Sequence, residues 1–384
     1  MISEQVPLSG MTTLQVGGPA ARFAEARTAE ELVEAVLAAD NAGEPLLVLG
    51  GGSNLVVSDD GFPGTVLRVA TTGVAARGAD DRVLVTVAAG EHWDRLVEWS
   101  VAEKLAGLEC LAGIPGLAGA TPIQNVGAYG QEVAATIIVV TVFDRANGSV
   151  SYLARDECGF GYRTSRFKRT NLPQAMPPGP GQGRPGPGPG PTGRYVVLNV
   201  TFALERDPMS VPVRYAELAA MLGVATGDRA PLADVRDAVL ELRRGKGMVL
   251  DPADPDTASA GSFFTNPVLG TGELARLERV VAVRRPETRV PTFPVAAELG
   301  QGGDSGRGLV KVPAAWLIEQ AGFYKGYPGR GAARISSKHT LALTNAGGAT
   351  AADLIGLAHE IAAGVRSAFG IELAHEPVLV GLTL

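Results

Sequence analysis

The chain has 384 residues and a formal net charge of −6, with 46% hydrophobic and 19% charged residues. This length exceeds one average domain, and the hydrophobic content suffices for a sizeable core, which excludes a disordered chain. The negative charge disfavours a nucleic-acid partner, whose binding face is usually basic. The longest apolar run, near residues 134–143, is too short to cross a bilayer, so we expect no membrane partner.

The N-terminus and the cysteines indicate the compartment. The first residues, MISEQVPLSG, lack the basic region and the apolar run of a signal peptide. The sequence has two cysteines, Cys110 and Cys158, which is too few for a disulfide framework, and their spacing suits no metal site. We therefore expect a protein of the reducing cytoplasm that holds no metal.

Helix and strand patterns alternate along the chain. Thr28, with Glu31 three residues later, predicts a capping box, and Gly43 ends the helix that begins there. Strands are predicted at 46–49, 65–69, 83–89, 137–143 and 196–204, and helices at 92–104 and 351–369, the last ending at Gly370 before a pair of strands. This mixture predicts an α+β or a mixed α/β protein.

A proline- and glycine-rich segment, PPGPGQGRPGPGPGPTG at 177–193, interrupts this pattern. It cannot bury a core and its prolines lack amide donors, so we expect a solvated loop insertion. It has no strict Gly-X-Y repeat, which excludes collagen. A ligand for a module that binds polyproline helices is the alternative.

The apolar run at 46–49 leads directly into Gly50, Gly51, Gly52, Ser53 and Asn54. A dinucleotide-binding turn of the G-x-G-x-x-G type would have glycine at position 55 and continue as a helix, whereas Leu55, Val56 and Val57 favour a strand. Glycines let backbone amides approach an anion closely. We therefore expect a pyrophosphate-binding loop between two strands, with a plain tight turn as the alternative.

A second glycine-rich stretch, GLECLAGIPGLAGATPIQNVGAYG, occupies residues 107–130. Its small residues and few charges suit a backbone that wraps around a large, flat ligand. Two such stretches from separate parts of the chain predict a cofactor of dinucleotide size. A buried irregular connection is the alternative, although long irregular loops in compact domains tend to be functional.

Five motifs follow one another along the chain: LGGGSNLVVSDDGF, AGIPGLAGATPIQNVGAYGQE, FGYRTSRFK, SAGSFFTNP and HEPVLVG. Together they resemble the UDP-N-acetylenolpyruvoylglucosamine reductase family, and the resemblance extends from MTTLQVGG at 11–18 to the last strand. The family completes UDP-N-acetylmuramate for bacterial peptidoglycan with FAD as cofactor. The resemblance implies an α+β fold, with a two-part FAD-binding domain of the vanillyl-alcohol-oxidase type and a separate α+β substrate-binding domain.

The resemblance also implies domain limits. Residues 1–72, joined by the C-terminal strands at 369–384, would form the first FAD-binding subdomain. Residues 73–244, with the insertion at 177–193, would form the second. Residues 245–368 would form the substrate-binding domain, with Trp316 and Ile318 on an apolar helix face.

The implied activity is the NADPH-dependent, FAD-mediated reduction of UDP-N-acetylglucosamine enolpyruvate. Hydride from reduced FAD would reach the enolpyruvyl methylene carbon, and negative charge would develop beside the carboxylate. Such a site needs positive or hydrogen-bonding groups for that charge and a proton donor for the carbon. Ser262 matches the family's proton donor, Arg163 its catalytic arginine and Glu376 its catalytic glutamate.

Further residues follow from the same motifs. The cofactor-binding candidates are Gly50, Gly51, Gly52, Ser53, Asn54, Gly113, Ile114, Pro115, Gly119, Thr121, Pro122, Gln124, Asn125, Gly127, Ala128 and Tyr129. The substrate-binding candidates are Tyr215, Lys246 and Asn266. An acidic loop, DPADPDT at 251–257, separates Lys246 from Ser262, and we interpret it as a solvated loop rather than a metal site.

Two other functions stay open. Another FAD oxidoreductase of the same superfamily would keep both glycine-rich stretches but would not need Arg163, Ser262 and Glu376 together. A non-catalytic flavin- or sugar-nucleotide-binding protein would bind FAD without turnover. The ordinary alternatives for the three residues are a surface ion pair, a turn serine and a solvated charge at a strand edge.

Overall fold

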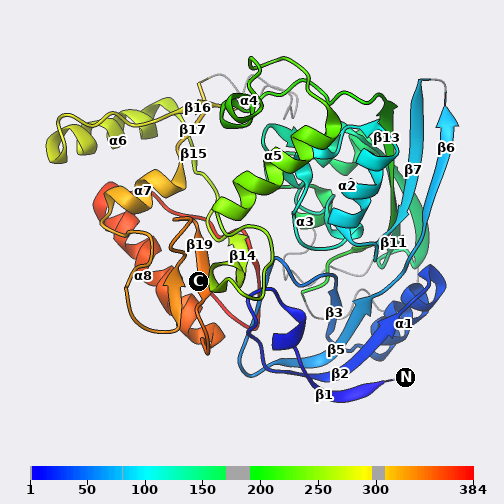
Figure 1. Ribbon diagram of the computed structural model, residues 1–384. Coiled ribbons are helices and arrows are strands. Elements are labelled where there is room, and N and C mark those ends of the chain that lie inside the picture. Colours follow the sequence, from blue (N-terminus) through cyan, green and yellow to red (C-terminus); the bar gives the residue numbers. More distant parts are fainter. Residues whose placement is uncertain (1, 80, 170–190, 296–307) are drawn as a thin grey trace. The chain divides into compact units, whose positions relative to one another are not determined.

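The computed structural model describes residues 2–79, 81–169, 191–295 and 308–384 (Figure 1). The predicted insertion at 177–193 therefore lies outside the described residues except for its last three. The described chain forms two compact units. Unit 1 comprises residues 1–11, 18–53 and 60–250, and unit 2 comprises residues 12–17, 54–59 and 251–384.

Unit 1 contains two larger sheets, a two-stranded pair and the helices that cover the sheets. Its elements are β1 (Ser3–Pro7), β2 (Pro19–Ala26), α1 (Ala29–Ala42), β3 (Leu46–Leu49), β5 (Phe62–Val69), β6 (Val74–Ala79), β7 (Arg82–Ala88), α2 (Trp93–Ala102), β8 (Leu105–Ala106), β9 (Gly127–Ala128), β10 (Gln131–Glu132), β11 (Ile137–Asp144), β12 (Ser149–Ala154), α3 (Arg166–Arg169), β13 (Tyr195–Arg206), α4 (Ala216–Leu222) and α5 (Leu232–Gly245).

The first sheet has the order β1-β2-β5-β3, in which β5 runs parallel to both β2 and β3. Helix α1 connects β2 to β3. As predicted, the Thr28 hydroxyl accepts the Glu31 amide at 3.1 Å and Gly43 ends the helix with a left-handed φ of 66°. The Glu31 carboxylate accepts the amide of Arg27, one residue before the cap. The chain leaves this sheet at the end of β3 and enters the first glycine-rich stretch at Gly50.

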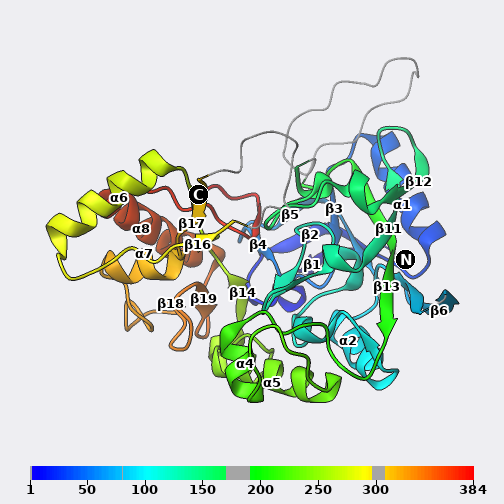
Figure 2. The same ribbon diagram turned by 90° about the horizontal axis from the view of Figure 1, so that it is seen from above.

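The second sheet is antiparallel and has the order β12-β11-β13-β7-β6, with β8 also pairing with β13. Figures 1 and 2 show α2 and α5 on the same side of it. Trp93 on α2 packs against Phe202 on β13, with ring centroids 5.9 Å apart. Both side chains are fully buried, so this contact lies in the core of unit 1.

Unit 2 has its own elements and its own core. They are β4 (Leu55–Val57), β14 (Ser259–Ser262), β15 (Val268–Leu269), α6 (Thr271–Arg284), β16 (Phe293–Pro294), β17 (Val310–Lys311), α7 (Ala314–Gln320), β18 (Ala333–Ile335), β19 (Ala342–Asn345), α8 (Ala351–Phe369) and β20 (Val378–Val380). The strands form the sheets β14-β19-β18 and β15-β17-β16, and β20 pairs in parallel with β4.

The predicted helix at 351–369 is found with those bounds as α8, because Thr350 caps its start and Gly370, at φ 68°, ends it. The strand pair expected after it is not found in the described residues. One strand, β20, pairs with the distant β4, and His375 forms an isolated bridge with Phe264. On α7, Ile318 is fully buried, whereas Trp316 is partly buried and stacks on Phe369 at 6.3 Å.

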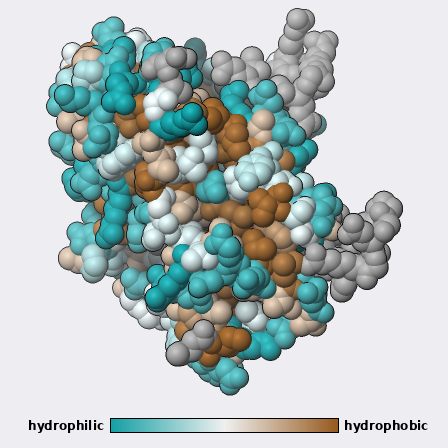
Figure 3. All heavy atoms as spheres, turned by 90° about the vertical axis from the view of Figure 1, so that its right-hand side faces the viewer, coloured by the Kyte–Doolittle hydropathy of each residue, from teal (hydrophilic) through white to brown (hydrophobic). Residues whose placement is uncertain are grey.

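Polar and apolar residues are interspersed on the side of the molecule seen in Figure 3. In unit 1 the exposed apolar side chains include Val74 on β6 and Tyr152 on β12, both edge strands of the second sheet. Within the described ranges, no helix combines the length and the apolar character that a membrane span requires.

Candidate active site

The two glycine-rich stretches meet in unit 1. A Cβ atom on Gly51 would lie 2.7 Å from the Cα of Gly116, and one on Gly116 would lie 2.8 Å from the Ser53 hydroxyl oxygen. The Ser53 hydroxyl donates to the Pro115 carbonyl at 3.1 Å. Contact this close requires glycine on both sides, so the packing accounts for the residue type at Gly51 and Gly116.

The first stretch also offers backbone donors. Gly52 is buried and has a left-handed φ of 61°. In the part of the chain that the structure describes, no hydrogen bond joins the amides of Gly51, Gly52 or Ser53 to an acceptor. Buried amides are nearly always paired, so this loop fits a ligand with anionic oxygens, such as the pyrophosphate of FAD.

Part of the second stretch is held by the protein itself. Gly119 donates its amide to the Ala89 carbonyl at 2.9 Å, and a Cβ there would lie 2.5 Å from the Cβ of Ala89. The Thr121 hydroxyl donates to the Ala118 carbonyl at 2.8 Å. The Gly113 amide donates to the Asp94 carboxylate at 2.5 Å. Ile114, Ala128 and Tyr129 pack against the core of unit 1, whereas Pro122 and Gln124 lie in the turn before Asn125.

Asn125 connects this stretch to Arg163. Its side chain is fully buried, and its amide donates to the Glu132 carboxylate at 2.7 Å and to the Gly161 carbonyl at 3.2 Å. Its oxygen accepts the Ala134 amide at 3.2 Å. Arg163 stands in a tight turn at φ 52° and donates to the Gly127 carbonyl at 2.7 Å. The predicted catalytic arginine is therefore fixed directly to the predicted cofactor segment.

Tyr129, Tyr215 and Lys246 come together although they are far apart in the sequence. The two tyrosine rings meet edge to face at 5.3 Å, and the Lys246 Nζ lies 5.7 Å from the Tyr129 ring centre. The Lys246 Nζ also lies 2.7 Å from the Glu217 carboxylate. Burial lowers the pKa of Lys246, but the hydrogen bond to Glu217, together with the electrostatic effects of Tyr129, Glu217 and Tyr215, outweighs it and the pKa is raised. Two predicted substrate residues thus adjoin a predicted cofactor residue.

Arg243, on the last turn of α5, is not among the residues predicted from the sequence. Its Nη2 donates to the Met248 carbonyl at 2.7 Å and to the Gly113 carbonyl at 3.3 Å. Its Nε is buried and has no hydrogen-bond partner among the residues that the structure describes. Burial lowers the pKa of Arg243 to about 10. Its position three residues before Lys246, at the same end of a helix, is the sequence feature that relates it to that lysine.

In unit 2 the backbone brings Ser262 and Glu376 together. Ser262 ends β14, and the carbonyl of the next residue, Phe263, accepts the Glu376 amide at 2.8 Å. Asn54 adds a third segment, because its side-chain amide donates to the Glu376 carbonyl at 3.4 Å and its own carbonyl accepts the Val378 amide at 2.9 Å. The first glycine-rich stretch therefore ends at a residue that is bonded to Glu376 and to the start of β20.

Asn266 and His375, which lie close in sequence to Ser262 and Glu376, each contact a backbone group of the protein. The Asn266 side-chain oxygen accepts the Ala314 amide at 2.9 Å and so caps the start of α7. The His375 Nδ1 lies 2.8 Å from the Pro377 carbonyl oxygen. Asn266 is thus held in place by α7, beside the β14 strand that ends at Ser262.

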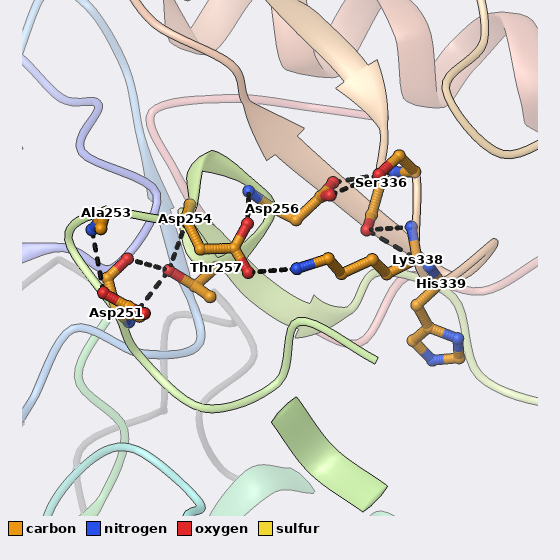
Figure 4. A network of polar contacts seen from close by, with 9 residues as sticks. Asp251, Ala253, Asp254, Asp256, Thr257, Ser336, Lys338 and His339 are labelled. Atoms are coloured by element: carbon orange, nitrogen blue, oxygen red, sulfur yellow. Dashed lines mark hydrogen bonds and ion pairs between the residues drawn. The ribbon is translucent and has the colours of Figure 1, made fainter. Parts of the chain in front are cut away.

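The acidic loop at 251–257 is held by polar contacts rather than free in solvent (Figure 4). The Asp254 carboxylate lies 2.5 Å from the Lys338 Nζ, and Asp256 accepts the Ser337 hydroxyl at 2.6 Å. The Thr257 hydroxyl donates to the Asp251 and Asp254 carbonyls at 2.9 and 2.8 Å. Among the described residues, no group of three acidic, histidine or cysteine side chains is arranged to hold a metal ion.

Comparison with known proteins gives the family. Residues 252–380 match the C-terminal domain of UDP-N-acetylenolpyruvoylglucosamine reductase, and residues 20–153 match an FAD binding domain. The chain is 54% identical to the UDP-N-acetylenolpyruvoylglucosamine reductase of Thermobifida fusca, covering 100% of this chain and 99% of that one. The chain belongs to the UDP-N-acetylenolpyruvoylglucosamine reductase family. The predicted family, its FAD cofactor and the class of FAD-dependent oxidoreductase are thereby confirmed.

Other relatives of the reductase family agree. The enzyme of Streptomyces coelicolor is 52% identical over 98% of this chain and 90% of its own. The crystal structure of the reductase from Thermus caldophilus superimposes with a TM-score of 0.62 at 25% identity, over 99% of this chain and 100% of that one. The predicted α+β fold, with an FAD-binding domain and a separate reductase domain, is confirmed. Arg163, Tyr215 and Lys246 lie between the two matched ranges.

Proposed function

We propose that the chain catalyses the reaction for which its family is named, the NADPH-dependent reduction of UDP-N-acetylglucosamine enolpyruvate to UDP-N-acetylmuramate. The observation that carries this proposal is the match of residues 252–380 to the reductase C-terminal domain, since that range contains Ser262 and Glu376. Support also comes from the 54% identity over the full chain and from a glycine-rich loop that fits an anionic cofactor.

Three side chains of the protein, those of Ser262, Arg163 and Glu376, each have a separate role in this reaction. Bound FAD supplies the hydride for the enolpyruvyl methylene carbon. Ser262 delivers a proton to the carbon beside the carboxylate. Its half-buried hydroxyl makes no hydrogen bond with another described residue, which leaves it available to a substrate.

Arg163 and Glu376 stabilise and orient the reacting groups. A guanidinium held by the Gly127 carbonyl is suited to pair with the substrate carboxylate and with the enolate-like charge that develops next to it. Glu376, half-buried and fixed by its backbone to Phe263, orients a water molecule or a substrate group. These roles account for all three residues in one reaction.

Tyr215, Lys246 and Asn266 hold the sugar nucleotide. Tyr215 and Lys246 are a phenol and an ammonium group that suit phosphate oxygens, and Asn266 lies four residues after Ser262. Because Lys246 is paired with Glu217, phosphate binding exchanges one anionic partner of this lysine for another.

The expected domain division remains part of this proposal. The two sheets of unit 1 correspond to the two FAD-binding subdomains at 1–72 and 73–244, and residues 245–368 supply most of unit 2. We keep the C-terminal strands at 369–384 beside the first subdomain only through β4, which lies within 1–72 in sequence but pairs with β20 and belongs with it to unit 2. We also keep the cytoplasm as the location, since both cysteines are free and buried.

Product analysis tests this function. The purified protein is incubated with FAD, NADPH and UDP-N-acetylglucosamine enolpyruvate, and the sugar nucleotide is examined by mass spectrometry. We expect a product that has gained two hydrogens and that carries deuterium when the reaction is run in heavy water, with one NADPH oxidised per product. NADPH oxidation that leaves the sugar nucleotide unchanged would favour another oxidoreductase. Bound FAD without turnover would favour a binding protein.

A further inference from the structure

Arg243 interacts favourably with the Asp94 carboxylate only at longer range. No ion pair within 4.0 Å joins it to an acidic side chain of the described residues, although Arg236, two turns earlier on α5, pairs with Asp94 and Glu98 at 4.0 and 3.5 Å. The Asp94 carboxylate is further engaged by the Gly113 amide. The nearby negative charges are therefore committed elsewhere.

The protein leaves part of this guanidinium unused. Nη2 donates to two carbonyls, whereas the buried Nε donates to no group of the described chain. A buried polar donor without an acceptor is destabilising, and a buried charge more so. Burial does lower the pKa of Arg243, but to about 10, so the group stays charged at neutral pH.

The unused edge of Arg243 faces the second glycine-rich stretch. Nε lies close to Gly113, because a Cβ there would be 3.3 Å from it, although the tighter contacts of that Cβ would be with Leu240 and Val249 at 2.8 and 3.0 Å. Tyr129 and Asp94 also act electrostatically to favour the charged form of Arg243, whereas Arg163 repels it. Together with Lys246 beside Tyr129, three cations of unit 1 gather along this stretch.

We propose that Arg243 is a further binding residue, whose guanidinium donates to an anionic phosphate or carboxylate oxygen of a ligand held along residues 113–131. The identity of that ligand rests on the proposed function: the oxygen belongs either to FAD or to the enolpyruvyl sugar nucleotide. An arginine is suited to this role because its planar fork keeps its charge and can donate to two oxygens at once. The ligand oxygen supplies the close acceptor that the described residues do not offer to Nε.

Binding measurements on R243Q test the proposal without depending on turnover. Glutamine removes the charge but keeps a side-chain amide for the Met248 carbonyl. The Kd for FAD is measured on apo-protein by flavin fluorescence, and the Kd for the sugar nucleotide on FAD-loaded protein by the shift of the flavin spectrum. We expect one of the two affinities to fall by about 10- to 100-fold, and the affinity that falls shows which of the two ligands Arg243 contacts. R244Q removes the adjacent exposed charge and should change neither Kd by more than about twofold.

The outcome that overturns the proposal is a folded R243Q protein with both affinities unchanged. If R243Q does not fold, R243K keeps the charge but loses the fork, and it must still weaken one affinity for the proposal to stand. Unchanged affinities in R243K would overturn it as well. Wild-type product formation is measured in parallel, so that failure of the proposed reaction is seen separately from failure of the Arg243 assignment.

Discussion

At the scale of single residues, Ser262 carries the most specific chemical prediction. In S262A, NADPH should reduce the flavin at the wild-type rate, because the serine is assigned no part in that step. Reoxidation by the enolpyruvyl substrate should slow by about 10²- to 10⁴-fold, since the proton donor is missing. Anaerobic stopped-flow absorbance measures the two half-reactions separately.

The control for this substitution is S262C, which keeps an acidic hydrogen at nearly the same place. It should restore part of the second half-reaction. Equal slowing of both half-reactions in S262A would contradict the role of proton donor and would indicate damage to the flavin site instead.

Asn125 carries a structural prediction at the same scale. N125A would leave the Glu132 carboxylate, the Gly161 carbonyl and the Ala134 amide without their partner and would place alanine at φ 48°. We expect the free energy of unfolding to fall by about 3 kcal/mol in urea titrations. N147A, at an exposed turn residue, should cost less than about 1 kcal/mol. Equal losses in the two variants would refute the linking role of Asn125.

Sequence motifs predicted Ser262, Arg163 and Glu376 because each lies in a short segment with its own pattern. They could not predict Arg243. Its importance depends on Gly113, Met248 and Asp94 lying around it after folding, and these come from three separate segments. Asn266 differs again, since its contact with Ala314 at the start of α7 is not visible in the motif that contains it.

At the scale of elements, the contact between the two glycine-rich stretches is open to test. In G51A the added methyl would lie 2.7 Å from the Cα of Gly116, so one loop must move. We expect the FAD affinity to fall at least about tenfold, measured by flavin fluorescence. The matched control is G10A, where a Cβ meets nothing within 4 Å. The same FAD affinity in G51A as in G10A would show that this contact does not shape the cofactor site.

The polar network beside β14 predicts a dependence on pH. Burial raises the pKa of Asp256, but hydrogen bonds from Ser337 and Ser336 outweigh it and the pKa lies below the ordinary 3.8. The pKa of Lys338 is raised above 10.5 by its hydrogen bond to Asp254. The carboxylate contributes stability above pH 3.8 that is lost as pH falls through its lowered pKa. The lysine contributes below pH 10.5, and its contribution is lost as pH rises further.

D256N checks the acidic side of this window. At pH 7 its urea midpoint should lie below that of the wild type, and the difference should shrink as pH falls below 3.8 through the lowered pKa of the wild-type carboxylate. A difference that stays constant as pH falls through that pKa would mean that the charge of Asp256 does not stabilise this network.

Elements with local signals were predictable. Helices α1 and α8 were readable from Thr28 and Gly43 and from the pattern that ends at Gly370, because caps and periodicity are local properties. The two-residue strands β15, β16 and β17 were not, because such strands exist only through their pairing with each other. The expected C-terminal strand pair was wrong for the same reason: β20 pairs with β4, more than 300 residues earlier.

At the scale of the whole molecule, the chain builds two separate hydrophobic cores. Both cysteines lie in the core of unit 1. Burial raises the pKa of Cys158 to about 12 and raises that of Cys110 further. A disulfide reagent at pH 8 should therefore modify neither thiol in the native protein and both in urea, because it reacts with the thiolate.

FAD should protect these thiols if it binds unit 1. At 100 times its Kd, FAD should slow their labelling about 100-fold when labelling requires unit 1 to unfold. Rapid labelling of the native protein, or a labelling rate that FAD does not change, would contradict the placement of the cofactor in this unit.

The passage of the chain between the units was not predictable. Residues 12–17 and 54–59 belong to unit 2 although their neighbours in sequence belong to unit 1. Nothing local marks Asn54 as the crossing point, because its partners Glu376 and Val378 lie near the other end of the chain. The family motifs identified Asn54 as a candidate residue. They did not show that it connects the glycine-rich loop to Glu376 and to the start of β20.

An anaerobic titration of the wild-type protein, followed by its visible spectrum, tests directly whether the bound flavin is reduced by NADPH and reoxidised by the sugar nucleotide. NADPH should bleach a bound flavin, and UDP-N-acetylglucosamine enolpyruvate should then restore the oxidised spectrum. A flavin that bleaches with NADPH but does not return with this sugar nucleotide would contradict the proposed reaction.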